Sequence, residues 1–244
     1  MEFLYGRNPV FEALRANRRT FKRLLVAEGA QAKGRLAEIV ALARQRKLKV
    51  EEVKRSQLDG IASTHQGVAL EAGVYPYSGL NEMLELAEVR HEPPFLLLLD
   101  TLQDPQNLGT LLRTAEVVGV HGVILPLAHT ATVTPAVVSA SSGASEHMQV
   151  AQANLAQVIQ TLQQNDLWVV GLEGGPEALP PDEVRLDGPL ALVVGSEGEG
   201  MRRLVRDSCD VLLALPMRGQ VDSLNAAVAG SVALYLAWQA RAWK

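Results

Sequence analysis

The sequence predicts an α/β protein that consists of a small α/β module and a larger domain built on a parallel sheet. Three observations support this fold class. Strand-like apolar runs alternate with helix-like segments, Pro- and Gly-rich stretches interrupt the chain between residues 74 and 94, and charge is unevenly distributed. Hydrophobic residues make up 48% of the 244 residues, which is enough for a substantial core. We therefore expect domains at 1–74 and 95–244, joined by a linker at 75–94.

The first module is expected to alternate short helices and strands. Asn8 and Pro9 are typical of a helix N-cap followed by proline at the first helical position, which predicts a helix to about Ala16. Apolar periodicity and turn residues predict the elements that follow. They are a strand at 23–27, a helix at 34–47, a strand at 48–53, a short helix at 56–62 and a strand at 67–72.

The second part alternates more regularly. Its strand-like runs are almost continuously apolar, which is typical of parallel strands covered by helices on both faces. Ligands of such sheets bind at the loops that leave the carboxyl ends of the strands. The expected strands are 95–100, 122–126, 148–151, 167–171, 190–195 and 211–215, and the expected helices are 107–118, 135–145, 155–165, 201–207 and 223–241.

The two parts differ in the sign of their charge. Residues 1–75 contain 14 Lys and Arg against 8 Asp and Glu, whereas residues 76–244 contain 9 against 19. A basic module suits a polyanionic partner, but basic side chains also cover the solvent faces of many small domains. The charge distribution alone is compatible with either explanation.

Composition and patterning exclude several classes of protein. The single cysteine, Cys209, rules out an internal disulfide framework and a Cys-rich metal site, and the five histidines lack metal-ligand spacing. The first residues do not have the order of a signal peptide, and the longest apolar run, 95–99, is too short to span a bilayer. We therefore expect a soluble, cytoplasmic protein without a metal site or a membrane segment.

The first polar loop, residues 104–114, follows the expected strand at 95–100. Asn107 can cap the next helix, and Arg113 lies less than two turns further along it among apolar residues. We expect such a helix to be largely buried, so an arginine in it requires a partner. Arg113 is either a fixed guanidinium for a phosphate or hydroxyl group, or one half of a structural ion pair.

The second loop, residues 194–201, is a glycine-rich turn between a strand and a helix. Such turns often hold nucleotide phosphates, but Glu197 and Glu199 would repel a pyrophosphate. The two carboxylates are compatible with a cationic or hydroxyl-rich ligand. A tight turn without any ligand would also explain the glycines.

The third loop, residues 215–227, leads into the expected last helix. Ser223 is a suitable N-cap for this helix, whereas Asn225 lies in its expected first turn, where asparagine is unfavourable. The pair offers a hydroxyl and an amide to a ligand in the loop. The apolar stretch at 226–236 predicts a helix in the core or in an interface.

These loops resemble, in order and spacing, the three signature motifs of the SpoU class of RNA 2'-O-ribose methyltransferases in the SPOUT superfamily. The pattern N-x-G-x-x-x-R-T is present as Asn107, Gly109, Arg113 and Thr114. The pattern G-x-E-x-x-G is present as Gly195, Glu197 and Gly200. The third pattern, P-M-x-G followed by S-L-N, is present as Pro216, Met217, Gly219, Ser223, Leu224 and Asn225.

The resemblance extends to the first module. Residues 5–10 and 65–67 resemble the ribosomal-protein-like substrate-binding domain of one branch of the class. That branch includes the bacterial enzyme that methylates a guanosine in the peptidyl-transferase loop of 23S rRNA. The resemblance implies S-adenosylmethionine as cofactor, RNA and not DNA as substrate, and a guanosine of 23S rRNA as the expected target. It also implies a C-terminal trefoil knot that holds the cofactor and a homodimer formed through the knotted region.

The resemblance also implies roles for individual residues. Arg113 would hold or activate the ribose 2'-hydroxyl, and the other expected catalytic residues would orient the nucleotide, the arginine and the cofactor. Those residues are Asn107, Glu197, Ser223 and Asn225. Cofactor binding is expected around Gly195, Leu215, Met217, Ser223 and Leu224, and RNA binding at Arg7, Arg18, Arg19 and His65.

Two other classes of function are compatible with parts of the pattern. A nucleotide-dependent oxidoreductase could use the turn at Gly195, although its acidic residues and the lack of a phosphate-binding loop after the first strand of the sheet disfavour this. A non-catalytic RNA-binding protein could rely on the first module, although the complete set of motif residues argues against it. A tRNA-directed or resistance-conferring methyltransferase also fits, because the motifs indicate the reaction and not the RNA.

Overall fold

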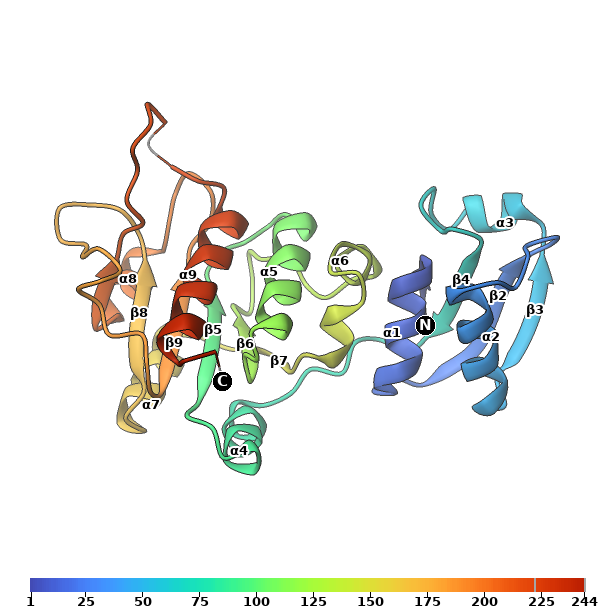
Figure 1. The fold of residues 1–244 in the computed structure, drawn as a ribbon, viewed down its shortest axis with the longest axis horizontal. Helices are drawn as coiled ribbons and strands as arrows, with labels where there is room; N and C mark the ends of the chain where they lie inside the picture. Colours follow the sequence, from blue (N-terminus) through green and yellow to red (C-terminus); the bar gives the residue numbers. More distant parts are fainter. Residues whose placement is uncertain (222, 244) are drawn as a thin grey trace. The chain divides into compact units, whose positions relative to one another are not determined.

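The computed structural model describes residues 1–221 and 223–243. The chain forms two compact units, which are the blue and the green-to-red parts of Figure 1 apart from one yellow-green segment. The first unit combines residues 1–76 with residues 133–147, and the second contains 77–132 and the rest from 148 onward. The segment 133–147 therefore packs with the first unit although it is flanked in sequence by parts of the second.

The first unit is built on a four-stranded sheet with the order β1-β4-β2-β3. Strand β4 is antiparallel to both of its neighbours, and β2 and β3 are parallel. The strands are β1 (Glu2–Tyr5), β2 (Phe21–Ala27), β3 (Lys49–Val53) and β4 (Val68–Ala72). The helices are α1 (Arg7–Ala16), α2 (Arg35–Gln45), α3 (Arg55–Asp59), α6 (Pro135–Ala140) and the 3₁₀ helix η1 (Ala144–His147).

Two features at the start of the chain differ from the sequence-based expectation. Strand β1 was not predicted, and helix α1 begins one residue before Asn8, with Gly6 and not Asn8 as its N-cap. Gly6 has a φ of 89°, a conformation that side chains disfavour, so a glycine is required between the strand and the helix. Pro9 still lies in the first turn of the helix, where its missing N–H has no cost.

The second unit is built on six parallel strands in the order β10-β8-β9-β5-β6-β7. This confirms the predicted parallel sheet. The strands are β5 (Phe95–Leu99), β6 (Gly122–Leu125), β7 (Val150–Gln152), β8 (Trp168–Leu172), β9 (Leu190–Val194) and β10 (Val211–Leu213). The helices are α4 (Leu80–Arg90), α5 (Pro105–Val117), α7 (Leu155–Gln164), α8 (Arg203–Ser208) and α9 (Ala226–Ala240).

Helices cover both faces of this sheet. Leu96 and Leu98 of β5 share one core cluster with residues of α4, α7 and α8. On the other face, α9 packs against α5 and β9, and Figure 1 shows these two helices side by side. Their contact is close, because a Cβ on Gly230 would lie 2.7 Å from Leu111 and 3.3 Å from Val194. Every residue of β5 and of β9 is buried, which explains their continuously apolar sequences.

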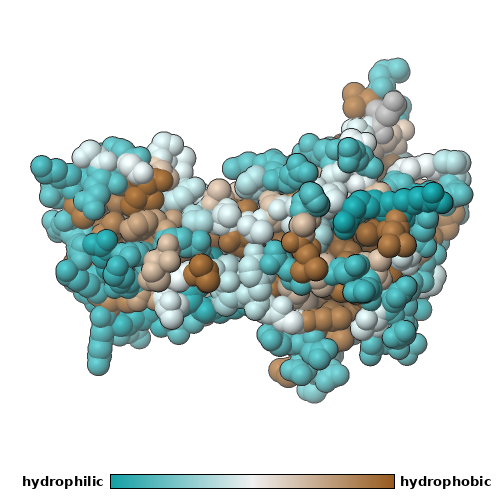
Figure 2. Space-filling view, turned by 180° about the vertical axis from the view of Figure 1, so that it is seen from behind, coloured by the Kyte–Doolittle hydropathy of each residue, from teal (hydrophilic) through white to brown (hydrophobic). Residues whose placement is uncertain are grey.

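In the view of Figure 2, each unit shows teal hydrophilic groups together with patches of brown hydrophobic groups. Within the described residues, no helix is long and apolar enough to cross a membrane. The same residues contain no group of three or more His, Cys, Asp or Glu side chains that could hold a metal ion.

Candidate active site

Three polar loops follow three strands of the six-stranded sheet. They connect β5 to α5, β9 to α8 and β10 to α9. Because all strands of this sheet are parallel, their carboxyl ends lie along one edge. The loops after β5 and β9 are neighbours there, since those two strands pair directly. The edge therefore collects the three polar loops that the sequence singled out.

Three side chains meet at this edge: Asn107 from the first turn of α5, Glu197 from the loop after β9, and Asn225 from the start of α9. The Nδ2 of Asn107 donates to Oε1 of Glu197 at 3.0 Å, and the Nδ2 of Asn225 donates to Oδ1 of Asn107 at 3.1 Å. Asn225 also donates to the same oxygen of Glu197. Residues that are distant in sequence thus form one hydrogen-bonded cluster, which ties the three loops together.

The structure corrects two predictions about helix caps. Asp104, and not Asn107, is the N-cap of α5. At α9 the N-cap is Asn225, whose Oδ1 accepts from two backbone N–H groups of the first turn at 3.0 and 3.1 Å, whereas Ser223 lies before the cap. Both halves of the Asn225 amide are used, because its oxygen caps α9 while its nitrogen holds Glu197.

The glycine-rich turn after β9 is tightly closed. The backbone groups of Ser196 and Gly200 bond to each other in both directions, at 3.0 and 3.2 Å. A Cβ on Gly195 would lie only 2.3 Å from the carbonyl carbon of Gly200, so no other residue fits without moving the backbone. The backbone of the turn is therefore held in one conformation, and Glu197 lies between its two closing residues.

A cavity of about 860 Å³ opens beside this cluster. The sequence-predicted cofactor residues all line it, and so do two of the expected catalytic residues besides Ser223. The five cofactor residues are Gly195, Leu215, Met217, Ser223 and Leu224, and the other two are Glu197 and Asn225. The cavity falls in the size range of small-molecule sites, roughly 300–1,000 Å³.

One wall of the cavity was not predicted from the sequence. Residues 172–175, at the end of β8, line it together with the predicted loops. Glu173 accepts from the guanidinium of Arg206 at 2.7 Å and from the backbone N–H of Met201 at 3.4 Å, so it also fixes the start of α8. The pair Gly174-Gly175 after a predicted strand was the available signal for this loop.

Comparison with known proteins identifies the family. Residues 94–235 match the SpoU rRNA methylase family, and residues 3–78 match the family described as RNA 2'-O ribose methyltransferase substrate binding. The chain belongs to the SpoU family. This confirms the resemblance that the three loop motifs indicated, and it makes the chain an RNA methyltransferase by family.

Individual SpoU relatives cover nearly the whole chain. A Bacillus subtilis protein named after the TrmH family of tRNA/rRNA methyltransferases is 40% identical over 244 residues, which span 98% of this chain and 96% of that protein. The structure of the SpoU methyltransferase AviRb from Streptomyces viridochromogenes, in complex with AdoMet, has a TM-score of 0.80 at 22% identity and covers 99% of this chain and 91% of its own. The AdoMet-bound rRNA methyltransferase of Sinorhizobium meliloti has a TM-score of 0.77 at 24% identity, with coverage of 98% and 87%.

Arg113 does not lie where the sequence suggested. The prediction placed it in a largely buried helix, but the structure shows an exposed residue on α5. The apolar neighbours Leu111, Leu112 and Ala115 turn into the core, and Arg113 lies on the opposite, solvent-facing side of the same helix. The prediction that Arg113 is largely buried is therefore wrong for this SpoU chain.

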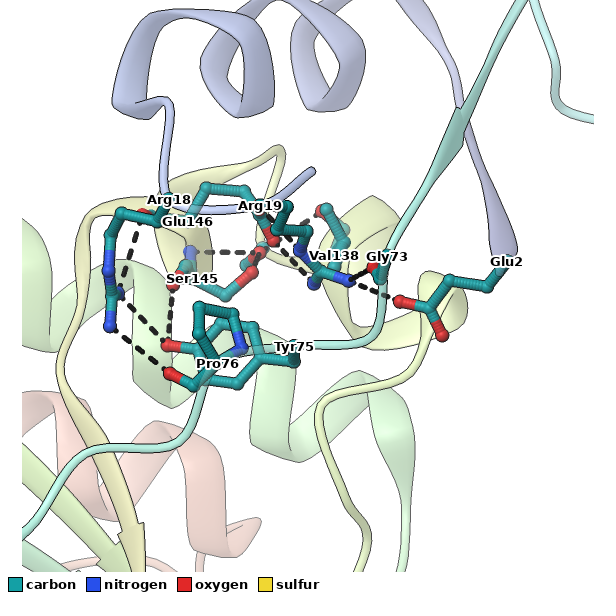
Figure 3. Close-up of polar contacts among 10 residues, drawn as sticks. Glu2, Arg18, Arg19, Gly73, Tyr75, Pro76, Val138, Ser145 and Glu146 are labelled. Atoms are coloured by element: carbon teal, nitrogen blue, oxygen red, sulfur yellow. Dashed lines mark hydrogen bonds and ion pairs between the residues drawn. The ribbon is translucent and has the colours of Figure 1, made fainter. Parts of the chain in front are cut away.

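Two of the predicted RNA-binding residues, Arg18 and Arg19, are engaged inside the first unit (Figure 3). The Arg19 side chain is fully buried, and it binds both carboxylate oxygens of Glu146, at 2.7 and 2.8 Å. It also donates to Glu2 and to the carbonyl oxygen of Gly73. Burial alone would lower the pKa of Arg19, but its hydrogen bonds and ion pairs with these carboxylates raise it. Because the side chain is fully buried and held by these contacts, the prediction that Arg19 contacts RNA is wrong.

Arg18 is partly buried and lies around the same centre. Its guanidinium donates to the carbonyl oxygen of Pro76 and to the hydroxyl of Tyr75, both at 3.3 Å. Burial raises the pKa of Tyr75 to about 12, so its hydroxyl stays protonated and donates to the carbonyl oxygen of Ser145 at 3.0 Å. Arg18 therefore has a structural role within the first unit, and this role accounts for an arginine at this position without an RNA contact.

The other two predicted RNA-binding residues differ in exposure. His65 is completely buried, and its ring bonds to the Asp59 carboxylate at 3.0 Å and to the backbone N–H of Gly67 at 2.8 Å. It therefore shapes the loop before β4, and its prediction as a direct RNA contact is wrong. Arg7 is half-buried, and its Nε donates to the backbone oxygen of Gln66 at 3.3 Å. Arg7 lies at the start of α1 beside that same loop.

Three exposed basic residues were missed at the end of the first sheet where Arg7 lies. The loop after β2 lies beside the end of β3, since Glu28 N bonds to Val53 O at 2.8 Å, and the end of β2 lies beside the loop before β4. Lys33 lies in the loop after β2, and Lys54 and Arg55 lie where β3 ends and α3 begins. None of the three forms an ion pair with another described residue. By contrast, Lys22, Arg23 and Lys49 pair with Glu71 and Glu51.

Proposed function

We propose that the protein transfers a methyl group from S-adenosylmethionine to a ribose 2'-hydroxyl in structured RNA. The observation that carries this proposal is the convergence of Asn107, Glu197 and Asn225 beside a cavity formed by the SpoU loop motifs. Family membership supports the reaction class, and the relatives crystallised with AdoMet support the cofactor.

The cavity suits S-adenosylmethionine by size and by chemistry. Its volume of about 860 Å³ is sufficient for a ligand with a nucleoside and an amino acid part. Leu172, Val194 and Leu213 supply apolar walls from three strand ends, and the carboxylates of Glu173 and Glu197 favour a cation over a phosphate. The bound cofactor would supply an electrophilic methyl group on a positively charged sulfur.

The chain's own task in this reaction is to position the ribose and to assist loss of its hydroxyl proton. Arg113 is exposed on α5, the helix that follows the first polar loop, so RNA can reach its guanidinium. We assign to it the contact with the 2'-hydroxyl or the adjacent phosphate, for which the planar guanidinium fork is suited. Glu197 is fixed by the amides of Asn107 and Asn225, which keep its carboxylate in one orientation.

We further propose 23S rRNA as the substrate, with a guanosine as the methylated nucleotide, which would place the reaction in the cytoplasm. The substrate-binding family match over residues 3–78 supports RNA recognition by the first unit. A tRNA target is the alternative, because the B. subtilis relative is named for both RNA classes. Mapping of 2'-O-methyl sites in total RNA from cells with and without the protein tests both. Loss of a 23S rRNA site supports the proposal, loss of a tRNA site supports the alternative, and no lost site argues for a non-catalytic RNA-binding protein.

We also propose that the enzyme is a homodimer and that its C-terminal segment forms the knot that the family resemblance implies. Helix α9 exposes an apolar face, in which Val228, Val232 and Tyr235 are each more than 40% exposed. With Trp243 and Thr110 of α5, this face lines a shallow apolar hollow of about 390 Å³. An exposed apolar face of this kind suits a two-fold interface, at which the same patch meets its own copy.

A further inference from the structure

A second cavity, of about 270 Å³, lies in the same unit as the proposed cofactor cavity. It is lined by residues 126–129 after β6, by residues around the start of α7, and by Arg202, Leu204 and Val205 at the start of α8. Strands β6 and β7 belong to the same parallel sheet as β9, so both cavities open at its carboxyl edge. None of the SpoU loop motifs described above supplies a residue to this second cavity.

Arg202 is held in place by a buried carboxylate. Asp100, at the end of β5, is completely buried, and its Oδ2 accepts from the backbone N–H of Arg202 at 2.8 Å. Its Oδ1 lies 2.8 Å from Nε and 2.7 Å from Nη2 of the Arg202 guanidinium. The Arg202 side chain is nevertheless 49% exposed, and its Nη1 has no partner among the described residues. A guanidinium oriented in this way loses little freedom when it binds a ligand.

The walls of the cavity combine apolar and polar groups. Leu127 and Leu204 line it and are 71% and 68% exposed, which is unusual for two leucines close together on a surface. His129 and Asn154 add hydrogen-bonding side chains, and Arg202 adds a positive charge. The cavity is slightly smaller than typical small-molecule sites, so it fits a fragment such as one planar ring system.

We propose that this cavity receives an unstacked nucleobase that flanks the methylated nucleotide of the RNA substrate. The two exposed leucines would contact the faces of the base, and Arg202 would donate to its edge or to its phosphate. Proteins recognise single-stranded RNA in this way, with bases splayed into pockets and contacted by guanidinium groups. The proposal rests on the RNA methyltransferase function, and it makes Arg202, Leu127 and Leu204 determinants of which RNA is methylated.

The test combines protein variants that alter the cavity with RNA substrates that lack the base of one flanking nucleotide. Ala128→Trp fills the cavity from an exposed loop position, and Leu204→Ser removes one wall without touching the core. Val89→Ser, at an exposed position on α4 that does not line either cavity, is the matched control. Each variant is assayed for RNA affinity, KM and kcat with a methylatable rRNA fragment, and for S-adenosylmethionine affinity by calorimetry. Arg202→Ala is avoided, because it would leave Asp100 buried without its partner.

We expect Ala128→Trp and Leu204→Ser to weaken RNA binding roughly 5- to 100-fold, the effect of losing one stacked base, with unchanged affinity for the cofactor. The wild type should bind an RNA that lacks the base of the recognised flanking nucleotide more weakly than the intact RNA. Ala128→Trp should bind both RNAs with the same, reduced affinity. The proposal would be overturned if, at every flanking position, the loss of affinity caused by removing the base simply added to the loss caused by Ala128→Trp. If the wild type methylates no RNA at all, the proposed function fails first, so the two failures are distinguishable.

Discussion

Arg19 and Glu146 form a two-point ion pair in which neither side chain reaches the solvent. Their contacts are 2.7 and 2.8 Å, and the two side chains are 0% and 1% exposed. They are 127 positions apart in sequence, because Glu146 belongs to the segment 133–147 that folds with the first unit. The substrate-binding unit is therefore completed by residues that lie inside the SpoU methylase region of the chain.

Removing one partner of this pair should be much more costly than removing both. We expect Arg19→Met to lower the free energy of unfolding by about 3–5 kcal/mol, since Glu146 would stay buried without a counter-charge. The double variant Arg19→Met with Glu146→Leu should recover a large part of this loss. Urea unfolding of the full chain measures both. Arg15→Met, which breaks an exposed pair with Glu12, is the control and should cost less than 1 kcal/mol.

RNA binding should depend on the exposed basic end of the first sheet and not on the predicted Arg18, Arg19 and His65. Replacing Lys54 and Arg55 by Glu should weaken RNA binding. Each lost phosphate contact should reduce the steepness of the plot of log association constant against log salt concentration by about 1. Affinity measured over a salt series checks this. Lys49→Glu is the control, because Lys49 is already paired with Glu51. An equal effect of the control would show that only overall charge matters.

A fragment of residues 76–244 is a poor test of the same point. The basic balance of residues 1–75 predicts that such a fragment loses most of its RNA affinity. However, Val137, Val138 and Glu146 are buried within the first unit, and the fragment lacks the residues 1–75 that pack with them. The fragment would then expose apolar side chains, so weak binding could reflect misfolding. Point substitutions in the full chain avoid this difficulty.

The dimer should depend on the apolar face of α9. Tyr235→Asp and Val232→Asp place charges on exposed positions of that face, so the folded monomer should tolerate them while a two-fold interface would bring like charges together. We expect sedimentation to show a dimer for the wild type and a monomer for the variants at micromolar concentration. A wild type that sediments as a fully active monomer would contradict the proposal.

Sequence periodicity predicted the six parallel strands because β5, β6 and β9 are wholly buried, and because each strand is an apolar run followed by a turn or helix signal. It missed β1, whose four residues EFLY are too short and too mixed to show a period. The segment 133–147 could not be assigned to the first unit either. Its packing depends on pairs such as Arg19 with Glu146, and a single sequence shows no sign of a contact across 127 positions.

The candidate site was predictable to the level of loops but not of individual roles. The three polar loops were expected at the carboxyl ends of parallel strands, which lie along one edge, but the contacts among Asn107, Glu197 and Asn225 became visible only in the structure. The role of Asn225 as N-cap was misread, since the start of α9 was expected at Ser223. The burial of Arg113 was also misread, because apolar neighbours along a sequence can all face the opposite side of a helix.

Asn225 offers a way to separate helix capping from the site cluster. Asn225→Asp keeps an oxygen that can cap α9, but it removes the Nδ2 donor and places a second carboxylate beside Glu197. We expect little change in the melting temperature and a clear loss of cofactor affinity and turnover. Asn225→Ala should in addition lose about 1 kcal/mol of stability through the missing cap. Equal activity of Asn225→Asp and wild type would show that the cluster only supports the loops.

Arg113 provides the most direct test of the proposed chemistry. Because it is exposed on α5, Arg113→Ala should change the free energy of unfolding by no more than about 0.5 kcal/mol and should leave cofactor binding intact. If its guanidinium contacts the reacting ribose or its phosphate, turnover should fall by about 10²–10³, the usual effect of losing one transition-state contact. Arg113→Lys should restore little of it, since a point charge does not reproduce the planar fork. Methylation rate, thermal unfolding and cofactor affinity are measured together for both variants. A near wild-type rate for Arg113→Ala would remove this residue from the catalytic set, and a loss of rate confined to KM for RNA would make it a binding residue only.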